Sequence, residues 1–470
     1  MTESFTHIKK AYFLGIGGIG MSALARYFHS RGVVVCGYDK TETPLTVELS
    51  SEGIAVSYMD NPDRLPSWFS AGQDFSEVLV VYTPAIPKDH KELNHIAALG
   101  VRLWKRSEVL GEVTRGVRTI AVAGTHGKTT TSTMIAHVLH HSGRNVTAFL
   151  GGISSNYHTN LLLASNREHE IMVAEADEYD RSFLRLSPDV SVITSLDPDH
   201  LDIYGSHQTM VDCYTEFASR LKPGGSLFVK SGIERTSNIT PTHTYSATME
   251  GDFKASNLRI ENGAYVFDVI GPDYMITDLL LYCPGRHNVE NAVAATIVCH
   301  QEGLTPDEIR TGLAAFKGVH RRFEYRLRSD QKVVIDDYAH HPTELKAAIQ
   351  TVRELYPGKK ILGVFQPHLY SRTRDFADGF AQSLSELDEL VLLDIYPARE
   401  LPIPGITSSM ILGKCTIDEK KLVSKEELFD HVSNADAYVI LMLGAGDIDA
   451  LVEGVVDSIS SKLQTQQLNP

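Results

Sequence analysis

A lysine and several threonines follow two glycines in the run TIAVAGTHGKTTT, residues 119–131. The first five residues predict a buried strand, and the residues after the run carry apolar side chains at helical spacing. Glycines between a strand and a helix let backbone N–H groups converge on an anion, and the helix dipole adds partial positive charge there. The run therefore predicts a phosphate-binding loop, in which Lys128 reaches terminal phosphates and Thr129 holds Mg²⁺.

This loop matches the pattern GxxxxGK[ST] incompletely, because position 122 is Val and the first glycine is Gly124. We interpret it as a shortened phosphate loop with ATP as the expected ligand. The residues expected to bind ATP here are Gly124, Thr125, His126, Gly127, Lys128, Thr129 and Thr130.

A second glycine loop lies near the N-terminus, where AYFL precedes a GxGxxG frame made by Gly15, Gly17 and Gly20. Such glycines permit a tight turn and the close approach of a diphosphate, and an acidic residue after the next strand can bond a ribose hydroxyl. Asp39 ends the next apolar run and fits that role. The ligand is left open between NAD and another nucleotide diphosphate.

Two strand-like runs after the ATP loop end in polar residues, IMVAEADE and VSVITSLDPDH. In open α/β sheets, ligands lie beyond the carboxyl ends of the strands. Glu175 and His200 are therefore candidate ligands of Mg²⁺, or of Mn²⁺, near Thr129. A phosphate contact is the alternative for His200, since Mg²⁺ prefers oxygen ligands.

These loops require elements to position them, and alternating strands and helices are expected along the whole chain. We predict an α/β protein of three domains: a Rossmann-like N-terminal domain (1–107), a central P-loop ATPase domain with a mostly parallel sheet (108–320) and a Rossmann-like C-terminal domain (321–470). Three strand-like runs are indicated after the ATP loop, and four in the C-terminal segment. Three of the latter end in polar clusters, at 336–341, 368–374 and 444–447, which predicts one shared crevice.

The composition excludes several classes of protein. A formal net charge of −15 over 470 residues argues against a nucleic-acid binder, which needs a basic face. The five cysteines form no CxxC pair, so neither a disulfide framework nor a zinc site is indicated. With no signal peptide and no apolar run of membrane-spanning length, we expect a cytoplasmic protein without membrane insertion. An oligomer is left open.

Seven motifs in order, GTHGKTT, EADE, DPDH, GRHNVENA, YAHHPTE, FQPH.YSRTRD and PIPG, closely resemble those of the Mur ligases of bacterial peptidoglycan synthesis. The resemblance spans essentially the whole chain. It implies domains for a UDP sugar, for ATP and for an incoming amino acid, in that order, and it makes UDP rather than NAD the expected ligand of GxGxxG.

The resemblance also implies roles for individual residues. The expected catalytic residues are Lys128, Glu175, His200, His287 and Asn288, with Thr129, Glu175 and His200 at the metal. Asn288, Arg322 and Asp337 join the ATP-binding residues, although capping of a helix is the alternative for Asn288. The expected UDP-sugar residues are Gly15, Gly17, Gly18, Gly20, Met21, Ser22, Asp39 and Thr83. The expected amino-acid residues are Tyr338, His341, His368 and Arg372.

The implied reaction is phosphorylation of the lactyl carboxylate of UDP-N-acetylmuramate by ATP, followed by attack of the amine of L-alanine on the acyl phosphate. His200 and His341 are candidate bases for the amine. The chain departs from the family at Leu369, where FQPHRY has Arg, which leaves strict preference for L-alanine open. Residues 201–220 contain no lysine, which agrees with the alanine-adding branch. The alternatives are a tripeptide-adding ligase of murein recycling, a folate-polyglutamate ligase, an NAD oxidoreductase and a non-catalytic nucleotide-binding module.

Overall fold

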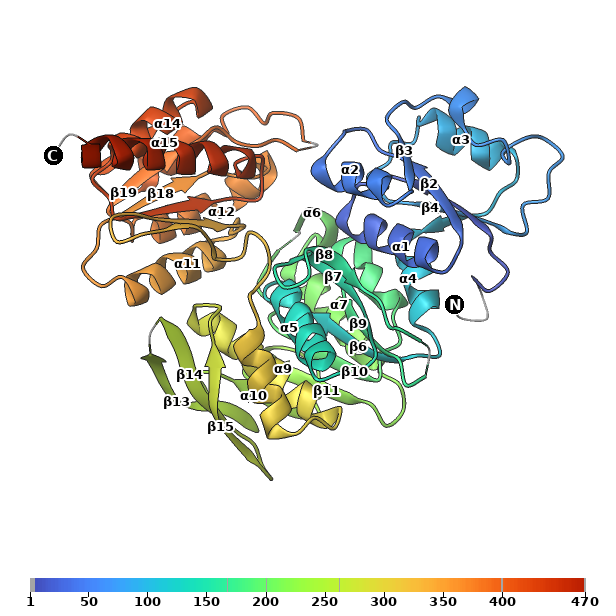
Figure 1. The fold of residues 1–470 in the computed structure, drawn as a ribbon, viewed down its shortest axis with the longest axis horizontal. Coiled ribbons are helices and arrows are strands. Elements are labelled where there is room, and N and C mark those ends of the chain that lie inside the picture. The colour runs from blue at the N-terminus through green and yellow to red at the C-terminus, as the bar shows by residue number, and fades with distance from the viewer. Residues whose placement is uncertain (1–4, 167, 200, 262, 399, 469–470) are drawn as a thin grey trace. The chain divides into compact units, whose positions relative to one another are not determined.

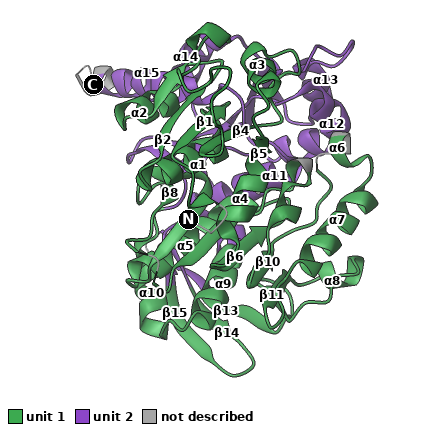
Figure 2. Cartoon of the chain, turned by 90° about the vertical axis from the view of Figure 1, so that its right-hand side faces the viewer, with its two compact units in different colours: residues 1–257, 267–279, 290–317 green, residues 258–266, 280–289, 318–470 purple. Residues whose placement is uncertain are grey.

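The computed structural model describes residues 5–166, 168–199, 201–261, 263–398 and 400–468. It contains three sheets, of five, ten and six strands (Figure 1). The chain divides into two compact units, coloured separately in Figure 2. The first unit comprises residues 1–257, 267–279 and 290–317, and the second comprises 258–266, 280–289 and 318–470.

The five-stranded sheet has the order β3-β2-β1-β4-β5, and its strands are parallel. Its central strands read as continuous apolar runs because parallel sheets are covered on both faces. The strands are β1 (Lys10–Leu14), β2 (Val34–Tyr38), β3 (Ala55–Ser57), β4 (Val78–Tyr82) and β5 (Leu103–Lys105), and the helices are α1 (Ile19–Ser30), α2 (Pro44–Ser51), α3 (Lys91–Ala98) and α4 (Arg106–Thr114).

The ten-stranded sheet has the order β15-β14-β13-β12-β11-β10-β6-β9-β7-β8. Strand β6 lies between β9 and β10 and runs parallel to both, so the loops after these three strands meet at one edge. The strands are β6 (Arg118–Ala123), β7 (Val146–Ser154), β8 (Thr159–Leu162), β9 (Ile171–Glu175), β10 (Val190–Ile193), β11 (Ser226–Lys230), β12 (His243–Ser246), β13 (Phe253–Glu261), β14 (Ala264–Ile270) and β15 (Met275–Leu281). The helices that follow these strands are α5 (Lys128–His141), α6 (Leu201–Tyr204), α7 (His207–Ser219), α8 (Ile233–Thr236), α9 (Arg286–Gln301) and α10 (Pro306–Ala315).

The six-stranded sheet lies in the second unit, with the order β16-β17-β21-β18-β19-β20. Strand β16 is antiparallel to β17, and the other pairings are parallel. The strands are β16 (Glu324–Arg328), β17 (Val333–Asp337), β18 (Ile361–Phe365), β19 (Glu389–Leu392), β20 (Glu419–Leu422) and β21 (Val439–Leu443), and the helices are α11 (Pro342–Leu355), α12 (Tyr370–Leu384), α13 (Ser408–Lys414), α14 (Lys425–Asn434) and α15 (Asp449–Leu468).

The predicted α/β class with mostly parallel sheets is confirmed, but the two later sheets have more strands than the sequence indicated. In the ten-stranded sheet the additional strands include β7, β8 and β12 to β15. In the six-stranded sheet they are β16 and β20. Three of the edge strands, β15, β16 and β20, lack a continuous buried run, and β20 (EKKL) is largely exposed. An edge strand needs only one apolar face, or none, so its sequence carries a weak signal.

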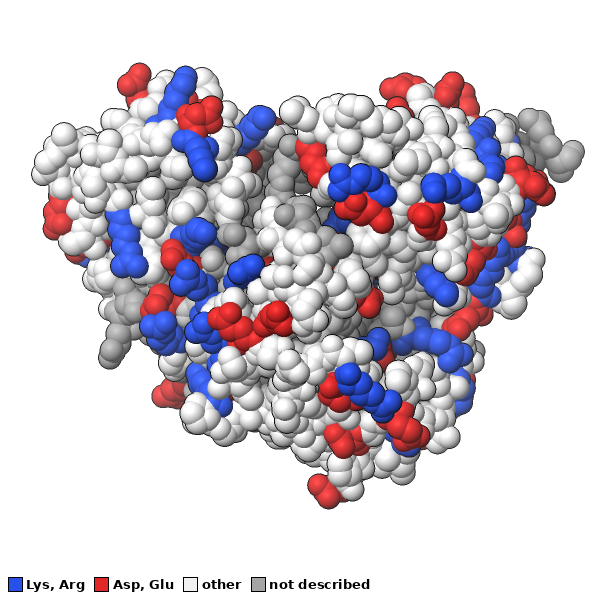
Figure 3. Space-filling model, turned by 180° about the vertical axis from the view of Figure 1, so that it is seen from behind, with Lys and Arg blue, Asp and Glu red and all other residues white. Residues whose placement is uncertain are grey.

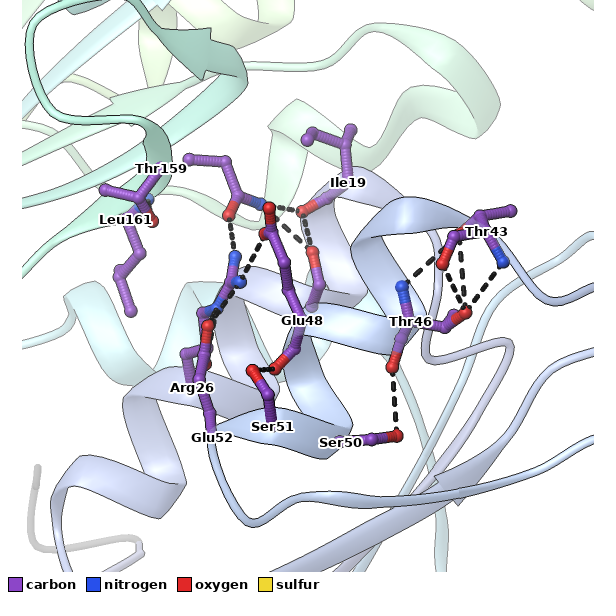
Figure 4. Close-up of polar contacts among 12 residues, drawn as sticks. Ile19, Arg26, Thr43, Thr46, Glu48, Ser50, Ser51, Glu52, Thr159 and Leu161 are labelled. Carbon is purple, nitrogen blue, oxygen red and sulfur yellow. Dashed lines mark hydrogen bonds and ion pairs between the residues drawn. The ribbon is translucent and has the colours of Figure 1, made fainter.

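A buried arginine attaches helix α1 to the ten-stranded sheet (Figure 4). The Arg26 guanidinium donates to both carboxylate oxygens of Glu52 and to Glu48 on α2, and its Nη1 donates to Asn160 Oδ1 on β8 at 2.8 Å. The Asn160 amide in turn donates to the Ile19 carbonyl and to Ser22 Oγ in the first turns of α1. We call these residues the α1 anchor. It fixes the N-terminal glycine loop to the β7–β8 edge.

None of the helices within the described part of the chain is long and apolar enough to cross a membrane.

Candidate functional site

The predicted ATP loop connects β6 to α5, and two of its glycines adopt left-handed backbone angles. Gly124 has φ +134° and Gly127 has φ +81°, which side chains disfavour. A Cβ on Gly124 would lie 2.1 Å from Thr194 Oγ1, and one on Gly127 would lie 2.8 Å from Asn291 Oδ1. The loop is therefore packed so closely by its neighbours that these positions accept only glycine.

Residues at the end of β10 hold the loop in shape. The His126 N–H donates to Ser195 Oγ at 2.7 Å, and the Thr125 N–H donates to the Ser195 carbonyl at 3.1 Å. The Thr194 hydroxyl bonds the His126 carbonyl. Sequence analysis did not identify Thr194, Ser195 or Asn291. For the first two, the available signal was the pair of hydroxyl residues directly before the LDPDH motif.

Lys128 and Glu178 form a buried ion pair at the start of α5. Lys128 Nζ donates to the Gly124 carbonyl at 2.6 Å and to the Glu178 carboxylate at 2.9 Å. Their side chains are 13% and 2% exposed. Burial raises the pKa of the Glu178 carboxyl to about 7, opposed by the Lys128 ammonium. Burial also acts to lower the pKa of Lys128, but Glu178 and Glu175 outweigh it and the lysine pKa is raised. The predicted phosphate-binding cation is thus charged and held beside the loop.

One of the two described metal candidates ends strand β9, and the other lies in the helix that follows the neighbouring strand β6. Glu175 ends β9 and lies in register with Val122 of β6, two residues before the loop, and Thr129 is in the first turn of α5. Gly151 on β7 makes room for the Glu175 carboxylate, since a Cβ there would lie 2.0 Å from Oε2. One carboxylate and one hydroxyl suit Mg²⁺, which takes its remaining ligands from phosphates and water. His200 lies outside the described residues, and among those described no group of three His, Cys, Asp or Glu side chains is arranged to hold a metal.

The remaining candidates of the GRHNVENA motif lie on α9. The Asn288 amide is buried and donates to the Pro284 carbonyl at 2.6 Å, which ties the start of α9 to the preceding turn. His287 is exposed. Asn291, one turn further on, is the residue of this motif whose side chain lies against Gly127 of the ATP loop. Residues three positions apart lie on the same face of a helix, and this spacing from Asn288 was the signal that could have identified Asn291.

The N-terminal glycine loop brings together several predicted UDP-sugar residues. Gly15 has φ +85° and lies against Thr83, whose Cγ2 would be 2.5 Å from a Cβ on the glycine. The Gly17 N–H donates to Asp39 Oδ2 at 2.8 Å, so the Asp39 carboxylate braces the loop backbone. The Gly18 N–H donates to the Gly15 carbonyl. Gly20, Met21 and Ser22 begin α1, where Met21 and Ser22 are buried.

The predicted amino-acid residues lie in the second unit, together with three of the ATP candidates, Asn288, Arg322 and Asp337. The guanidinium carbons of Arg321 and Arg322 lie 5.1 and 5.0 Å from the Tyr338 ring centre. His341 caps α11, because its Nδ1 accepts from the Thr343 N–H at 3.3 Å.

Asp337 Oδ2 accepts from the Phe323 N–H and Oδ1 from the Ala339 N–H, and burial raises its pKa to about 7. His368 stacks on Tyr396, and Arg372 is buried on α12. Leu369, the position that departs from the family motif, has φ +67°, a conformation that a branched side chain rarely adopts. Such a backbone persists only where the surrounding structure holds it in place.

Charge on the surface is mixed. On the face drawn in Figure 3, acidic and basic side chains alternate among the described residues instead of gathering into one field. Anionic ligands of a chain with net charge −15 must therefore be met by local cations such as Lys128.

A phosphate-type loop at the carboxyl edge of a parallel sheet, with a lysine and a carboxylate beside it, defines a nucleotide-binding α/β protein. Three family profiles place it further: "Mur ligase family, catalytic domain" matches residues 10–118, "Mur ligase middle domain" matches 122–299, and "Mur ligase, glutamate ligase domain" matches 321–448. The chain belongs to the Mur ligase family.

The similar proteins include two curated relatives named UDP-N-acetylmuramate–L-alanine ligase. That of Parabacteroides distasonis is 49% identical over 464 residues, covering 97% of this chain and 98% of the relative. That of Porphyromonas gingivalis strain W83 is 52% identical over 450 residues, covering 95% and 98%. Among solved structures, the UDP-N-acetylmuramate–alanine ligase of Thermotoga maritima has a TM-score of 0.81 at 30% identity, covering 96% of this chain and 99% of that one. A murein peptide ligase of Psychrobacter arcticus shares the fold, with a TM-score of 0.67 at 21% identity, covering 96% and 98%.

Proposed function

We propose that this protein uses ATP to join L-alanine to the lactyl carboxylate of UDP-N-acetylmuramate, the first amino-acid addition in peptidoglycan precursor synthesis. The observation that carries the proposal is about 50% identity, over nearly the full length of both chains, to relatives named for this reaction. The intact phosphate loop with its charged lysine supports a catalytic chain rather than a binding module. All five cysteines are free thiols, which supports a reducing cytoplasm as its location.

The chemistry follows from the poor reactivity of a carboxylate. Phosphorylation by ATP gives an acyl phosphate, whose phosphate leaves when the free amine of L-alanine attacks, so that ADP, phosphate and an amide are formed. Transfer between two anions requires their charge to be offset, and we assign that role to Lys128. A bound Mg²⁺, or Mn²⁺, adds positive charge on the phosphates, and Thr129, Glu175 and His200 are the residues proposed to hold it.

Phosphate release from ATP tests the proposal directly. The purified protein is given UDP-N-acetylmuramate and Mg²⁺ with no amino acid, L-alanine, glycine, L-serine or the wall tripeptide. We expect release that needs both the sugar and L-alanine, and that Lys128→Ala abolishes. Release with the tripeptide alone would reassign the protein to murein recycling, and no release with any acceptor would refute a ligase function. Glycine or L-serine accepted as well as L-alanine would show that the preference for L-alanine is not strict, the point that Leu369 leaves open.

A further inference from the structure

Arg106 connects the N-terminal glycine loop to the acidic loop after β9. It is the first residue of α4, and its guanidinium lies over Gly20, where a Cβ would be 2.8 Å from Nη1 and 3.3 Å from Cζ. Its Nη2 donates to Asp177 Oδ2 at 2.8 Å. A planar guanidinium can contact a backbone on one edge and a carboxylate on the other. A side chain at position 20 would therefore displace the Arg106 guanidinium.

Asp177 is itself part of a fixed segment. Its Oδ1 accepts from the Tyr179 N–H at 3.0 Å, and its carbonyl accepts from the Phe183 N–H at 2.9 Å. The next residue, Glu178, pairs with Lys128 of the ATP loop. Arg106 follows β5 of the five-stranded sheet. It nevertheless reaches the segment after β9 that also faces the ATP loop.

The α1 anchor holds the first turns of α1 from another side, through Asn160 on Ile19 and Ser22 (Figure 4). Arg106 lies over Gly20, between those two positions. The start of α1 is consequently held at two points, both of which lead to the ten-stranded sheet.

Stability alone does not explain the Arg106 contact. The two side chains are 19% and 39% exposed, and a partly exposed ion pair contributes little to the free energy of unfolding. The α1 anchor, with Arg26 at 9% exposure, is the stronger fastening. What Arg106 adds is a defined position for the glycine loop relative to the acidic loop.

We propose that Arg106 is a positioning residue, through which Asp177 sets the geometry of the glycine loop for the UDP sugar. This inference rests on the proposed function, since it takes the sugar nucleotide as the ligand of that loop. Asp177 then contributes to the affinity for a ligand that it does not touch. The two residues act as one unit, so the loss of either has the effect of losing both.

Titration calorimetry, which measures the affinity of the full chain for UDP-N-acetylmuramate, tests the proposal. The wild type is compared with Arg106→Ala, Asp177→Asn, the double variant and Arg106→Lys. We expect each of the first two to weaken binding about tenfold, as for a lost charge-assisted hydrogen bond, and the double variant to equal either one. Lysine is a point charge without the planar fork, so Arg106→Lys should restore only part of the affinity. The control is Arg115→Ala at the C-cap of the same helix, whose 67% exposed side chain pairs with Glu112; it should leave the affinity unchanged.

Thermal unfolding separates positioning from structural damage, because the proposal expects the midpoints of Arg106→Ala and Asp177→Asn to stay near that of the wild type. Wild-type affinity in Asp177→Asn, or additive losses in the double variant, would overturn the coupling while leaving the proposed function intact. Absence of UDP-N-acetylmuramate binding by the wild-type chain would instead overturn the proposed function, and this inference with it.

Discussion

Replacing Lys128 by methionine separates the chemical role of the lysine from its structural one. The substitution keeps most of the side-chain volume and removes the cation 2.9 Å from Glu178. Glu178 is then a buried carboxyl without its ion-pair partner, and it must take up a proton to remain inside. Protonating a carboxyl with an ordinary pKa of 4.5 costs about 1.4 kcal/mol for each pH unit above that value. Because the pKa of Glu178 is already about 7 with the lysine in place, the wild type carries nearly all of this cost at pH 6. The destabilisation that the substitution adds is therefore close to zero at pH 6 and about 1.4 kcal/mol at pH 8, one pH unit above that pKa.

The assay is thermal unfolding at both pH values, followed by circular dichroism. At about 2 °C per kcal/mol for a body of this size, we expect a midpoint close to that of the wild type at pH 6 and about 3 °C lower at pH 8. Adding Glu178→Gln removes the buried acid, so Lys128→Met/Glu178→Gln should regain most of the midpoint at pH 8 while phosphate release stays abolished.

The matched control is Lys222→Met, whose partner Asp189 is 22% exposed; it should lose much less. Equal losses at both pH values, or a double variant as unstable as Lys128→Met, would refute this account of the pair.

Three further predictions follow from single contacts. Gly127→Ala places a Cβ 2.8 Å from Asn291 Oδ1 at φ +81°, and should lower kcat/KM for ATP by about tenfold or more in steady-state assays. Burial lowers the pKa of His137 to about 4, so the folded state resists protonation of this side chain. The stability present above pH 6.5 should therefore fall by on the order of 3 kcal/mol as the pH falls toward 4. In a plot of unfolding midpoint against pH, His137→Phe should flatten that part of the curve. Chelation by EDTA should abolish phosphate release and added Mg²⁺ should restore it, and Glu175→Gln should raise the Mg²⁺ concentration required by about tenfold or more.

Local patterns predicted the elements that carry the ATP loop. The expected strand over 119–123 corresponds to β6, and the helix after the loop corresponds to α5, because an apolar run and a helical period are visible in a few consecutive residues. The α/β class followed from repetition of the same alternation and is confirmed. The roles predicted for His200, His287 and the amino-acid residues remain predictions.

Contacts between distant residues could not be read from the sequence. Ser195 supports the loop from 69 positions beyond His126, and Arg106 meets Asp177 from 71 positions away. These partners are fixed by strand order, which places β9 and β10 on either side of β6 and which no local pattern encodes. Asp39 illustrates the same limit: its position after β2 was evident, but its hydrogen bond to the Gly17 N–H depends on how the loop turns.

The α1 anchor limits how this chain can exchange its parts. Arg26 lies on α1 and its acceptor Asn160 lies on β8, so a foreign segment in place of residues 1–107 would separate the two partners. A mismatched graft would leave the buried Asn160 Oδ1 without its Arg26 donor, and an unsatisfied buried polar group is costly. Chimeras should therefore be functional only when α1 and the β7–β8 edge are replaced together, so these two segments are expected to be inherited as a pair.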